Sequence, residues 1–317
     1  MKVSVIVPIY NAEKTLERIL NSLMSQTLKD FEVLMVNDGS NDSSGIICES
    51  YAKKDPRFKA IHKVNGGVSS ARQIGIERAT GEYIIHADSD DWVEQTMLEE
   101  LYNEAINKKA DIVICDYFVN YKNGQHYVNQ KPENLNPRNI QNELFGKLHG
   151  SCCNKLVNRK CIVDYNIRFT QGINYCEDLL FWLEILNYPL EISYLNKAFY
   201  HYYYDIDNKS IMGNYNMSFF NTSCKVVELI YNILPKEIRD INVRKFKISV
   251  KCGAFEHPIF TSKQYYNIYP EVNKYLWSDC KTSLVNKALI FLSYHGFYHL
   301  STWLYSKKNK LKGRIAR

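Results

Sequence analysis

The sequence has no cysteine spacing that indicates a disulfide framework or a zinc site. Its nine cysteines are scattered without a Cys-X-X-Cys pair, and Cys152 and Cys153 are adjacent, whereas zinc ligands are spaced along a chain. A signal peptide is also missing, because MKVSVIVPIYN runs directly into a strand pattern. These absences predict free thiols and a cytoplasmic protein.

A long uninterrupted apolar run is absent as well. The most apolar stretch, residues 285–305, is broken by Asn286, Lys287, Ser293 and further polar residues, so we predict no membrane-spanning helix. A basic cluster follows it, made up of Lys307, Lys308, Lys310, Lys312, Arg314 and Arg317. Two interpretations stay open: an interfacial helix on the inner face of the cytoplasmic membrane, and an ordinary packed helix with a solvated tail.

Charge of one sign is not in large excess. The chain has 40 Lys and Arg residues against 34 Asp and Glu residues, a formal net charge of +6. This excess is too small to indicate a nucleic-acid partner. With 45% hydrophobic residues, the chain is able to bury a core and should be mostly ordered.

The first half of the chain alternates β-branched runs with segments of helical period. The runs are VSVIVP, FEVLMVND, FKAIHK and EYIIHAD. Such alternation predicts an α/β fold with helices on both faces of a mostly parallel sheet. From about Tyr215 the pattern is helical and aromatic, and we therefore predict two domains, residues 1–212 and 213–317.

Acidic residues follow the predicted strands at the edge where open parallel sheets bind their ligands. Asp88 and Asp90 are two positions apart, a spacing that suits a divalent cation bridging a diphosphate. Asp38, in VNDGSNDSSG, could accept hydrogen bonds from a base or a ribose. Taken alone, each motif is explained more simply as a turn or a helix cap.

Two further motifs lie at predicted helix starts. The segment GGVSSAR places Arg72 one turn into a helix, where the helix start and a guanidinium both favour phosphate, although no Walker lysine follows. Glu177 and Asp178 begin the helical run LLFWLEIL. They could cap that helix, or one of them could take a proton from an attacking hydroxyl.

The order of these motifs resembles the family 2 glycosyltransferases, which have the GT-A fold. The matching segments are VSVIVPIYNAEKTL, VNDGSNDSS, GGVSSARQIGIERATGEYIIHADSDDW and YCEDLLFWLEI. They span roughly residues 1–210, and four ordered motifs are more specific than one. The resemblance implies a Rossmann-like sheet with a C-terminal helical extension. It also implies inverting transfer of a sugar from a nucleotide-diphosphate donor to a hydroxyl of a glycan or lipid-linked glycan of the bacterial cell envelope. The nucleotide that the resemblance implies is UDP.

The resemblance also implies roles for single residues. Asp90 and Asp88 look like the family's DXD motif, which binds Mn²⁺ or Mg²⁺, and Asp178 looks like the catalytic base, with Glu177 as a supporting acid. Asp38 is implied to contact the nucleoside, and Arg72 the base or the phosphates. The complete set implied to bind the donor is Pro8, Tyr10, Asn11, Asp38, Arg72, Asp88, Ser89 and Asp91.

The segment that follows the last predicted strand departs from the family pattern. Many relatives carry a basic residue there that closes over the diphosphate, whereas this sequence has acids, so that either His201 or Lys209 would have to supply the charge. Trp92 and Trp182 could stack on acceptor sugars, although packing on the core explains both more simply.

Two other functions compete with this interpretation. A nucleotidyltransferase would carry a glycine-rich, basic loop after its first strand, and Pro8-Ile9-Tyr10-Asn11-Ala12-Glu13 is neither. A catalytically inactive GT-A-like module that binds glycans or a partner protein is the second. Such a module has no need of Asp88 and Asp90, since neighbouring acids in a crevice repel each other.

Overall fold

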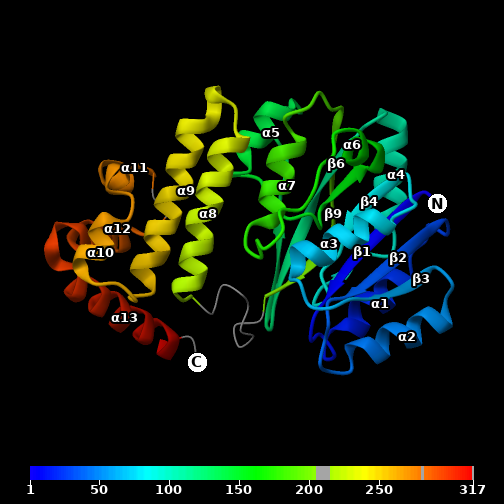
Figure 1. The fold of residues 1–317 in the computed structure, drawn as a ribbon, viewed down its shortest axis with the longest axis horizontal. Coiled ribbons are helices and arrows are strands. Elements are labelled where there is room, and N and C mark those ends of the chain that lie inside the picture. The colour runs from blue at the N-terminus through cyan, green and yellow to red at the C-terminus, as the bar shows by residue number, and fades with distance from the viewer. Residues whose placement is uncertain (205–214, 280–281, 316–317) are drawn as a thin grey trace. The chain divides into compact units, whose positions relative to one another are not determined.

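The computed structural model describes residues 1–204, 215–279 and 282–315, with side chains up to residue 308 (Figure 1). The chain forms two compact units, Met1–Asn208 and Lys209–Arg317, and each is described by itself. The predicted domain boundary, near residue 212, falls among residues outside the described ranges.

The amino-terminal half of the first unit is built from parallel strands. The strands are β1 (Val3–Ile9), β2 (Phe31–Asn37), β3 (Phe58–His62) and β4 (Tyr83–His86), in the order β3-β2-β1-β4. The connecting helices are α1 (Leu16–Met24), α2 (Ser44–Lys54) and α3 (Val68–Arg78). All seven residues of β1 and of β2 are buried, as expected for strands covered on both faces. The predicted strands and their parallel arrangement are confirmed.

The later strands extend this sheet in mixed directions. They are β5 (Trp92–Val93), β6 (Ile112–Tyr121), β7 (Gly124–Val128), β8 (Lys155–Asn158) and β9 (Ile192–Tyr203). The full order is β3-β2-β1-β4-β8-β6-β9-β5, with β7 paired to β6. β8 lies antiparallel between β4 and β6, whereas β9 runs parallel to β6. The first unit therefore has one continuous sheet, which brings the ends of β4, β6 and β9 to a shared region.

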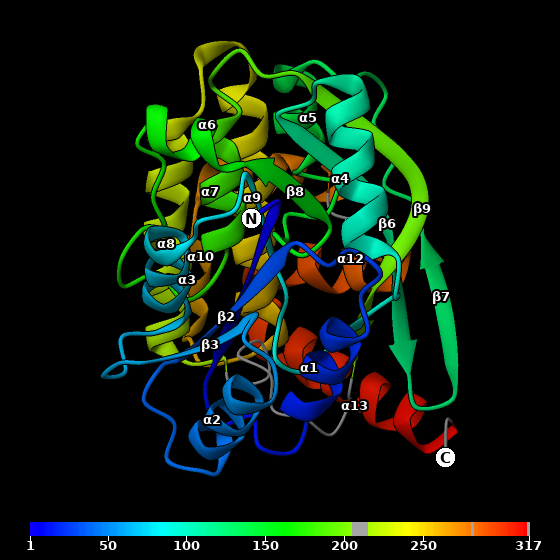
Figure 2. The same ribbon diagram turned by 90° about the vertical axis from the view of Figure 1, so that its right-hand side faces the viewer.

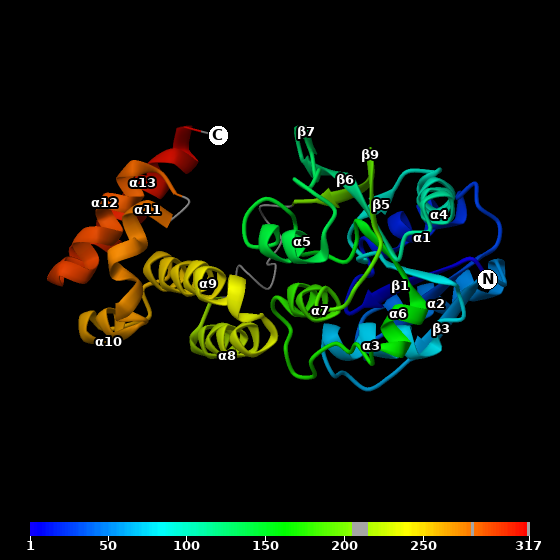
Figure 3. The same cartoon turned by 90° about the horizontal axis from the view of Figure 1, so that it is seen from above.

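Helices cover both faces of the sheet in the first unit. They include α4 (Met97–Lys108), α5 (Pro137–Glu143), α6 (Arg159–Asp164) and α7 (Glu177–Ile185). Figure 2 and Figure 3 show α1 and α4 on one face and α3, α6 and α7 on the other. The predicted α/β class and the helix that starts at Glu177 are confirmed.

The second unit is helical throughout its described residues. Its elements are α8 (Met217–Ile233), α9 (Lys236–Glu256), α10 (Ser262–Asn267), η2 (Pro270–Tyr275), α11 (Leu276–Asp279), α12 (Leu284–Leu292), η3 (Ser293–Phe297) and α13 (Tyr298–Ile315). Aromatic side chains fill its core, among them Phe255, Tyr265 and Tyr298. Across the described helices, none combines the length and the apolar character needed to cross a bilayer.

Candidate functional site

The segment Asp88–Asp91 leaves the end of β4 and is fastened to β9. The hydroxyl of Tyr200 accepts a hydrogen bond from the Asp88 amide at 2.9 Å and donates one to Asp91 Oδ2 at 2.6 Å. The other Asp91 oxygen accepts from the Tyr203 amide at 2.8 Å. Asp91 is fully buried. Burial, with the nearby charges of Asp90 and Asp88, raises its pKa well above the usual value.

Arg72, near the start of α3, lies among three carboxylates. Its Nη2 donates to Asp88 Oδ1 at 2.8 Å, and its Nη1 lies 3.2 Å from Glu177 Oε1 and also contacts Asp178. Only 3% of the residue is exposed. Burial alone would lower the pKa of Arg72, but Asp88 and Glu177 raise it, so the guanidinium stays charged. It therefore joins the segment after β4 to the start of α7.

Asp178 is held from two sides. One oxygen accepts a hydrogen bond from the Cys152 amide at 3.0 Å, and the other contacts Arg72. Glu177 beside it is buried, and burial raises its pKa although Arg72 opposes the shift. A carboxylate has about four lone pairs, so Asp178 retains capacity to accept a proton from a ligand hydroxyl.

These acids line a pocket of about 360 Å³. Arg72, Asp88, Glu177 and Asp178 form its charged side. Its aromatic side consists of Tyr117, His149, Tyr200 and Tyr202. Tyr202, on β9, is 39% exposed and lines the pocket. A small polar ligand with flat apolar faces, such as a sugar ring, suits these walls.

Asp38 follows β2 and organises the loop that leads into α3. Its two oxygens accept hydrogen bonds from the amides of Gly66 and Gly67, at 2.9 and 2.8 Å, and the Lys63 ammonium contacts it. Gly67 has φ +84°, a conformation that favours glycine. Asp38 therefore fixes the loop just before the helix that carries Arg72.

Residues after β1 lie beside this loop. Pro8 is buried in β1, whereas Tyr10 is 52% exposed. Asn11 has φ +49°, and its side-chain oxygen accepts from the Asn41 amide at 2.9 Å. None of these residues, nor the half-buried Ser89, lines the pocket around Asp178. The predicted donor residues thus form two groups, one after β1 and β2 and one after β4.

The candidate ligands for a divalent cation are the carboxylates of Asp88 and Asp90. Burial and the charge of Asp88 raise the pKa of Asp90 to about 6, which indicates crowded negative charge that a cation would relieve. Within the described residues, no three His, Cys, Asp or Glu side chains are grouped to hold a metal ion. Mg²⁺ is often bound by one or two carboxylates together with substrate phosphates. The pair therefore fits a cation that arrives with a diphosphate.

His201 and the two tryptophans do not line the pocket. His201 is buried, its Nε2 lies 2.8 Å from Glu94 Oε1, and its ring stacks between Trp92 and Phe118. Trp182 is a residue of α7, and its side chain is buried, with 1% exposed. The hypotheses of a diphosphate contact by His201 and of sugar stacking by these tryptophans therefore find no geometric support. Lys209 lies outside the described residues.

Sequence reasoning missed several residues that support the site. They are Arg18, whose guanidinium contacts the Asp90 carbonyl; Cys152, whose amide binds Asp178; and Tyr200 between Asp88 and Asp91. Each contact joins positions between 26 and 112 residues apart, so no local spacing reveals it. The predicted free thiols are confirmed for the cysteines in the described part of the chain.

Similarity to known proteins gives the family of this chain. Residues 4–165 match the family Glycosyl transferase family 2. EpsH of Bacillus subtilis (strain 168), named as a glycosyltransferase, is 35% identical over 237 residues, which are 71% of this chain and 67% of that protein. The poly(ribitol-phosphate) beta-N-acetylglucosaminyltransferase TarP of Staphylococcus aureus (strain N315) is 29% identical over 241 residues, covering 73% of this chain and 72% of TarP.

A solved structure has the same fold. Residues 1–349 of S. aureus TarS, in complex with UDP-GlcNAc, are similar with a TM-score of 0.70 and 22% identity, over 97% of this chain and 92% of that chain. The predicted fold and family are thereby confirmed. With the family match covering residues 4–165, the chain belongs to glycosyl transferase family 2 and has the GT-A fold.

Proposed function

We propose that this protein is an inverting glycosyltransferase that moves a sugar from a UDP-sugar to a hydroxyl of a glycan or lipid-linked glycan. One observation carries the proposal: Asp88, from the end of β4, and Asp178, from the start of α7, converge on one pocket around Arg72. Direct displacement needs two parts. One is a carboxylate that acts as the base, and the other is a separate acidic site at the diphosphate.

Asp178 acts as the general base in this proposal. It takes the proton of the acceptor hydroxyl while the hydroxyl oxygen bonds to the anomeric carbon. The bond from that carbon to the diphosphate breaks on the opposite face, so the configuration inverts and UDP leaves. The Cys152 amide and Arg72 orient Asp178, and Glu177 shares the charge of Arg72.

The donor occupies the edge formed by the ends of β1, β2 and β4. Asp88 and Asp90 would hold Mn²⁺ or Mg²⁺, which supplies positive charge to the departing diphosphate. The nucleoside lies against Pro8, Tyr10, Asn11 and Asp38, with Ser89 and Asp91 in the segment beside the donor sugar. The name of TarP and the UDP-GlcNAc held by TarS support a UDP-hexose or UDP-N-acetylhexosamine donor.

A catalytically inactive glycan- or partner-binding module is the alternative. Three carboxylates around one buried arginine favour the enzyme over this module, because clustered buried acids are costly and a binding surface does not require them.

The decisive experiment compares Asp178→Asn with Glu184→Gln, a control on the same helix α7 that does not line the pocket. We expect D178N to bind UDP with Mn²⁺ as the wild type does and to lose transfer by roughly a thousandfold, since general-base catalysis contributes factors of about 10² to 10⁴. E184Q should keep both properties. Equal loss of UDP binding and transfer in D178N would contradict the assignment of the base.

A surface of the second unit supports peripheral binding to the inner face of the cytoplasmic membrane. α12 and α13 form a hairpin, in which Lys308 Nζ lies 2.5 Å from Asn286 Oδ1. Apolar side chains are exposed along it: Leu284, Val285, Phe291, Leu292, Phe297, Leu300, Trp303 and Leu304. Residues 282–317 contain seven Lys and Arg residues and no Asp or Glu. Exposed aromatics beside unopposed basic charge suit an anionic bilayer, and a lipid-linked acceptor would be found there.

A further inference from the structure

We propose that Arg18 is a positioning residue for the metal-binding aspartates. It lies on α1, outside the four sequence motifs that identify the family, and it does not line the pocket. The inference rests on the proposed metal-binding role of Asp90. It adds Arg18 as the residue that helps to position Asp90.

Arg18 contacts two aromatic rings that also contact each other. Its guanidinium carbon lies 4.7 Å from the ring centroid of Trp92 and 4.7 Å from that of Tyr203. Its Nη2 donates a hydrogen bond to the carbonyl oxygen of Asp90. These two ring contacts and the hydrogen bond to the backbone limit how far the planar group can rotate. The donated hydrogen bond therefore has a fixed direction.

The stack continues into the sheet beyond Trp92. The Trp92 ring lies 4.8 Å from that of His201, at an interplanar angle of 11°, and His201 lies 4.7 Å from Phe118. We call the series Tyr203, Arg18, Trp92, His201 and Phe118 the arginine stack. It joins α1, β5, β6 and β9, so Arg18, on α1, is connected to three other elements of the first unit.

The arginine stack completes a set of bonds that hold the acidic segment through groups other than the Asp90 carboxylate. Asp88 is held through its amide by Tyr200, and Asp91 through both carboxylate oxygens by Tyr200 and Tyr203. Asp90, between them, is held through its carbonyl by Arg18. Because the Asp90 carbonyl is held, the direction of its Cα–Cβ bond is restricted, while its carboxylate forms no ion pair with the residues that the structure describes. Arg18 thus prepares a free carboxylate for a cation.

The test measures Mn²⁺ binding directly, in the presence of saturating UDP, from the loss of the electron paramagnetic resonance signal of the free aqueous ion. We expect Arg18→Met to weaken Mn²⁺ binding by roughly tenfold, as is common when a group that orients a metal ligand is removed. Arg18→Lys should give an intermediate loss, since lysine keeps the charge but not the planar stack. UDP affinity measured without Mn²⁺ should not change in either variant.

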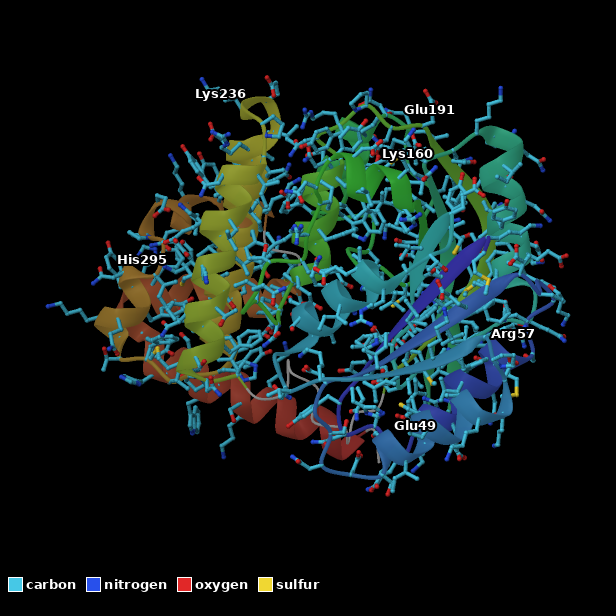
Figure 4. All side chains as sticks on the ribbon, turned by 45° about the vertical axis from the view of Figure 1, so that its right-hand side comes forward. Glu49, Arg57, Lys160, Glu191, Lys236 and His295 are labelled. Atoms are coloured by element: carbon cyan, nitrogen blue, oxygen red, sulfur yellow. The ribbon has the colours of Figure 1, made fainter. Side chains whose placement is uncertain are left out.

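Arg57→Met is the matched control. Arg57, labelled in Figure 4, also stacks on an aromatic ring, 4.4 Å from the centroid of Phe31, and it pairs with Asp55 away from the pocket. R57M should bind Mn²⁺ as the wild type does. Asp90→Ala serves as the reference for loss of the metal site.

Three outcomes would overturn the inference. First, R18M could bind Mn²⁺ with an affinity within about twofold of the wild type while D90A no longer binds it. The role of Arg18 would then be refuted, and the metal-binding role of Asp90 would be kept. Equal weakening in R18M and R57M would show general destabilisation instead of positioning. Unchanged Mn²⁺ binding in D90A would refute the metal role of Asp90, and the role of Arg18 would fail with it.

Discussion

At the scale of single residues, Arg72 is the shared counter-ion of the site. Asp88, Glu177 and Asp178 all lie against one guanidinium that is 3% exposed. Buried carboxylates are tolerated only where positive charge or hydrogen bonds compensate them. Arg72 therefore supports the stability of the first unit as well as the geometry of the pocket.

We predict that Arg72→Met lowers the free energy of unfolding by about 3 kcal/mol or more, because it leaves buried carboxylates unpaired. Urea denaturation at pH 7 measures the change. Arg78→Met, an exposed position at the end of the same helix α3, should have little effect. Adding Glu177→Gln to R72M should recover part of the loss, and no recovery would argue against charge repulsion as the cause.

The sequence was a good guide to which residues carry charge at the site and a poor guide to what each one touches. Asp88, Glu177 and Asp178 were predicted from their places after a strand and at a helix start, and they do line one pocket. Arg72 was expected to face base or phosphates, but in the structure it contacts carboxylates 16 and 105 residues away. Pairings of this kind depend on how β4 and α7 meet, which no local pattern encodes.

At the scale of elements, a buried carboxylate joins the strands of the parallel half. Glu32 on β2 accepts hydrogen bonds from Ser4 on β1 and from Thr80, and it pairs with Lys59 on β3 at 2.6 Å. Burial alone would raise the pKa of Glu32, but these partners together lower it to about 2. The carboxylate therefore stabilises the sheet when it is ionised.

The pH dependence of unfolding follows from this shift. The contribution of Glu32 is fully present above its usual pKa of 4.5 and is lost as the pH falls toward 2. We predict that Glu32→Gln lowers the free energy of unfolding by about 2 kcal/mol at pH 7. This figure allows for solvent screening at the half-exposed Lys59. The difference from the wild type should disappear near pH 2. Thermal unfolding across this range measures it. Glu49→Gln, an exposed residue labelled in Figure 4, should show no such pH dependence.

The loop before α3 allows a test of backbone conformation. Gly67 has φ +84°, and a Cβ there would lie 2.2 Å from Asn174 Oδ1, whereas Gly172 has φ +75° and open space around it. We predict that Gly67→Ala weakens UDP binding, because it disturbs the Gly67 amide, which donates a hydrogen bond to Asp38. Gly172→Ala should only lower the free energy of unfolding, by about 1 kcal/mol. Calorimetric titration with UDP separates the two, and equal UDP affinities would contradict the role of this loop.

Sequence patterns predicted the parallel strands because each is a buried β-branched run between turn residues. They did not predict the antiparallel insertion of β8, which is only four residues long and reads KLVN. Its pairing with Ile84 on β4 and Ile112 on β6 is decided by tertiary contacts, which local propensity does not record.

At the scale of the whole molecule, the charge of the second unit matters more than the net charge of +6. We predict that the protein of residues 1–317 binds vesicles containing anionic lipid at low salt and leaves them as salt rises, because ionic screening shortens the reach of basic residues. Sedimentation with vesicles measures this. Removing residues 307–317 should weaken binding, and Trp303→Ser with Phe297→Ser should weaken it further.

The control for these variants is Val64→Ser, since Val64 is exposed on the first unit. Binding that is equal for neutral and anionic vesicles, or unaffected by loss of residues 307–317, would contradict the electrostatic part of the proposal. If the apolar variants instead changed the mass of the protein in solution without changing vesicle binding, the hairpin of α12 and α13 would be a contact between copies of this chain.

The order of strands in the sheet also determines when the pocket is made during translation. Asp88 leaves the ribosome before Asp178 by roughly 5 to 20 seconds at a synthesis rate of about 5 to 20 residues per second. Until residues 155–158 follow, β4 has no partner on the side that β8 will occupy, so the nascent chain exposes the edge of a buried strand. The pocket is therefore among the last parts of the first unit to form.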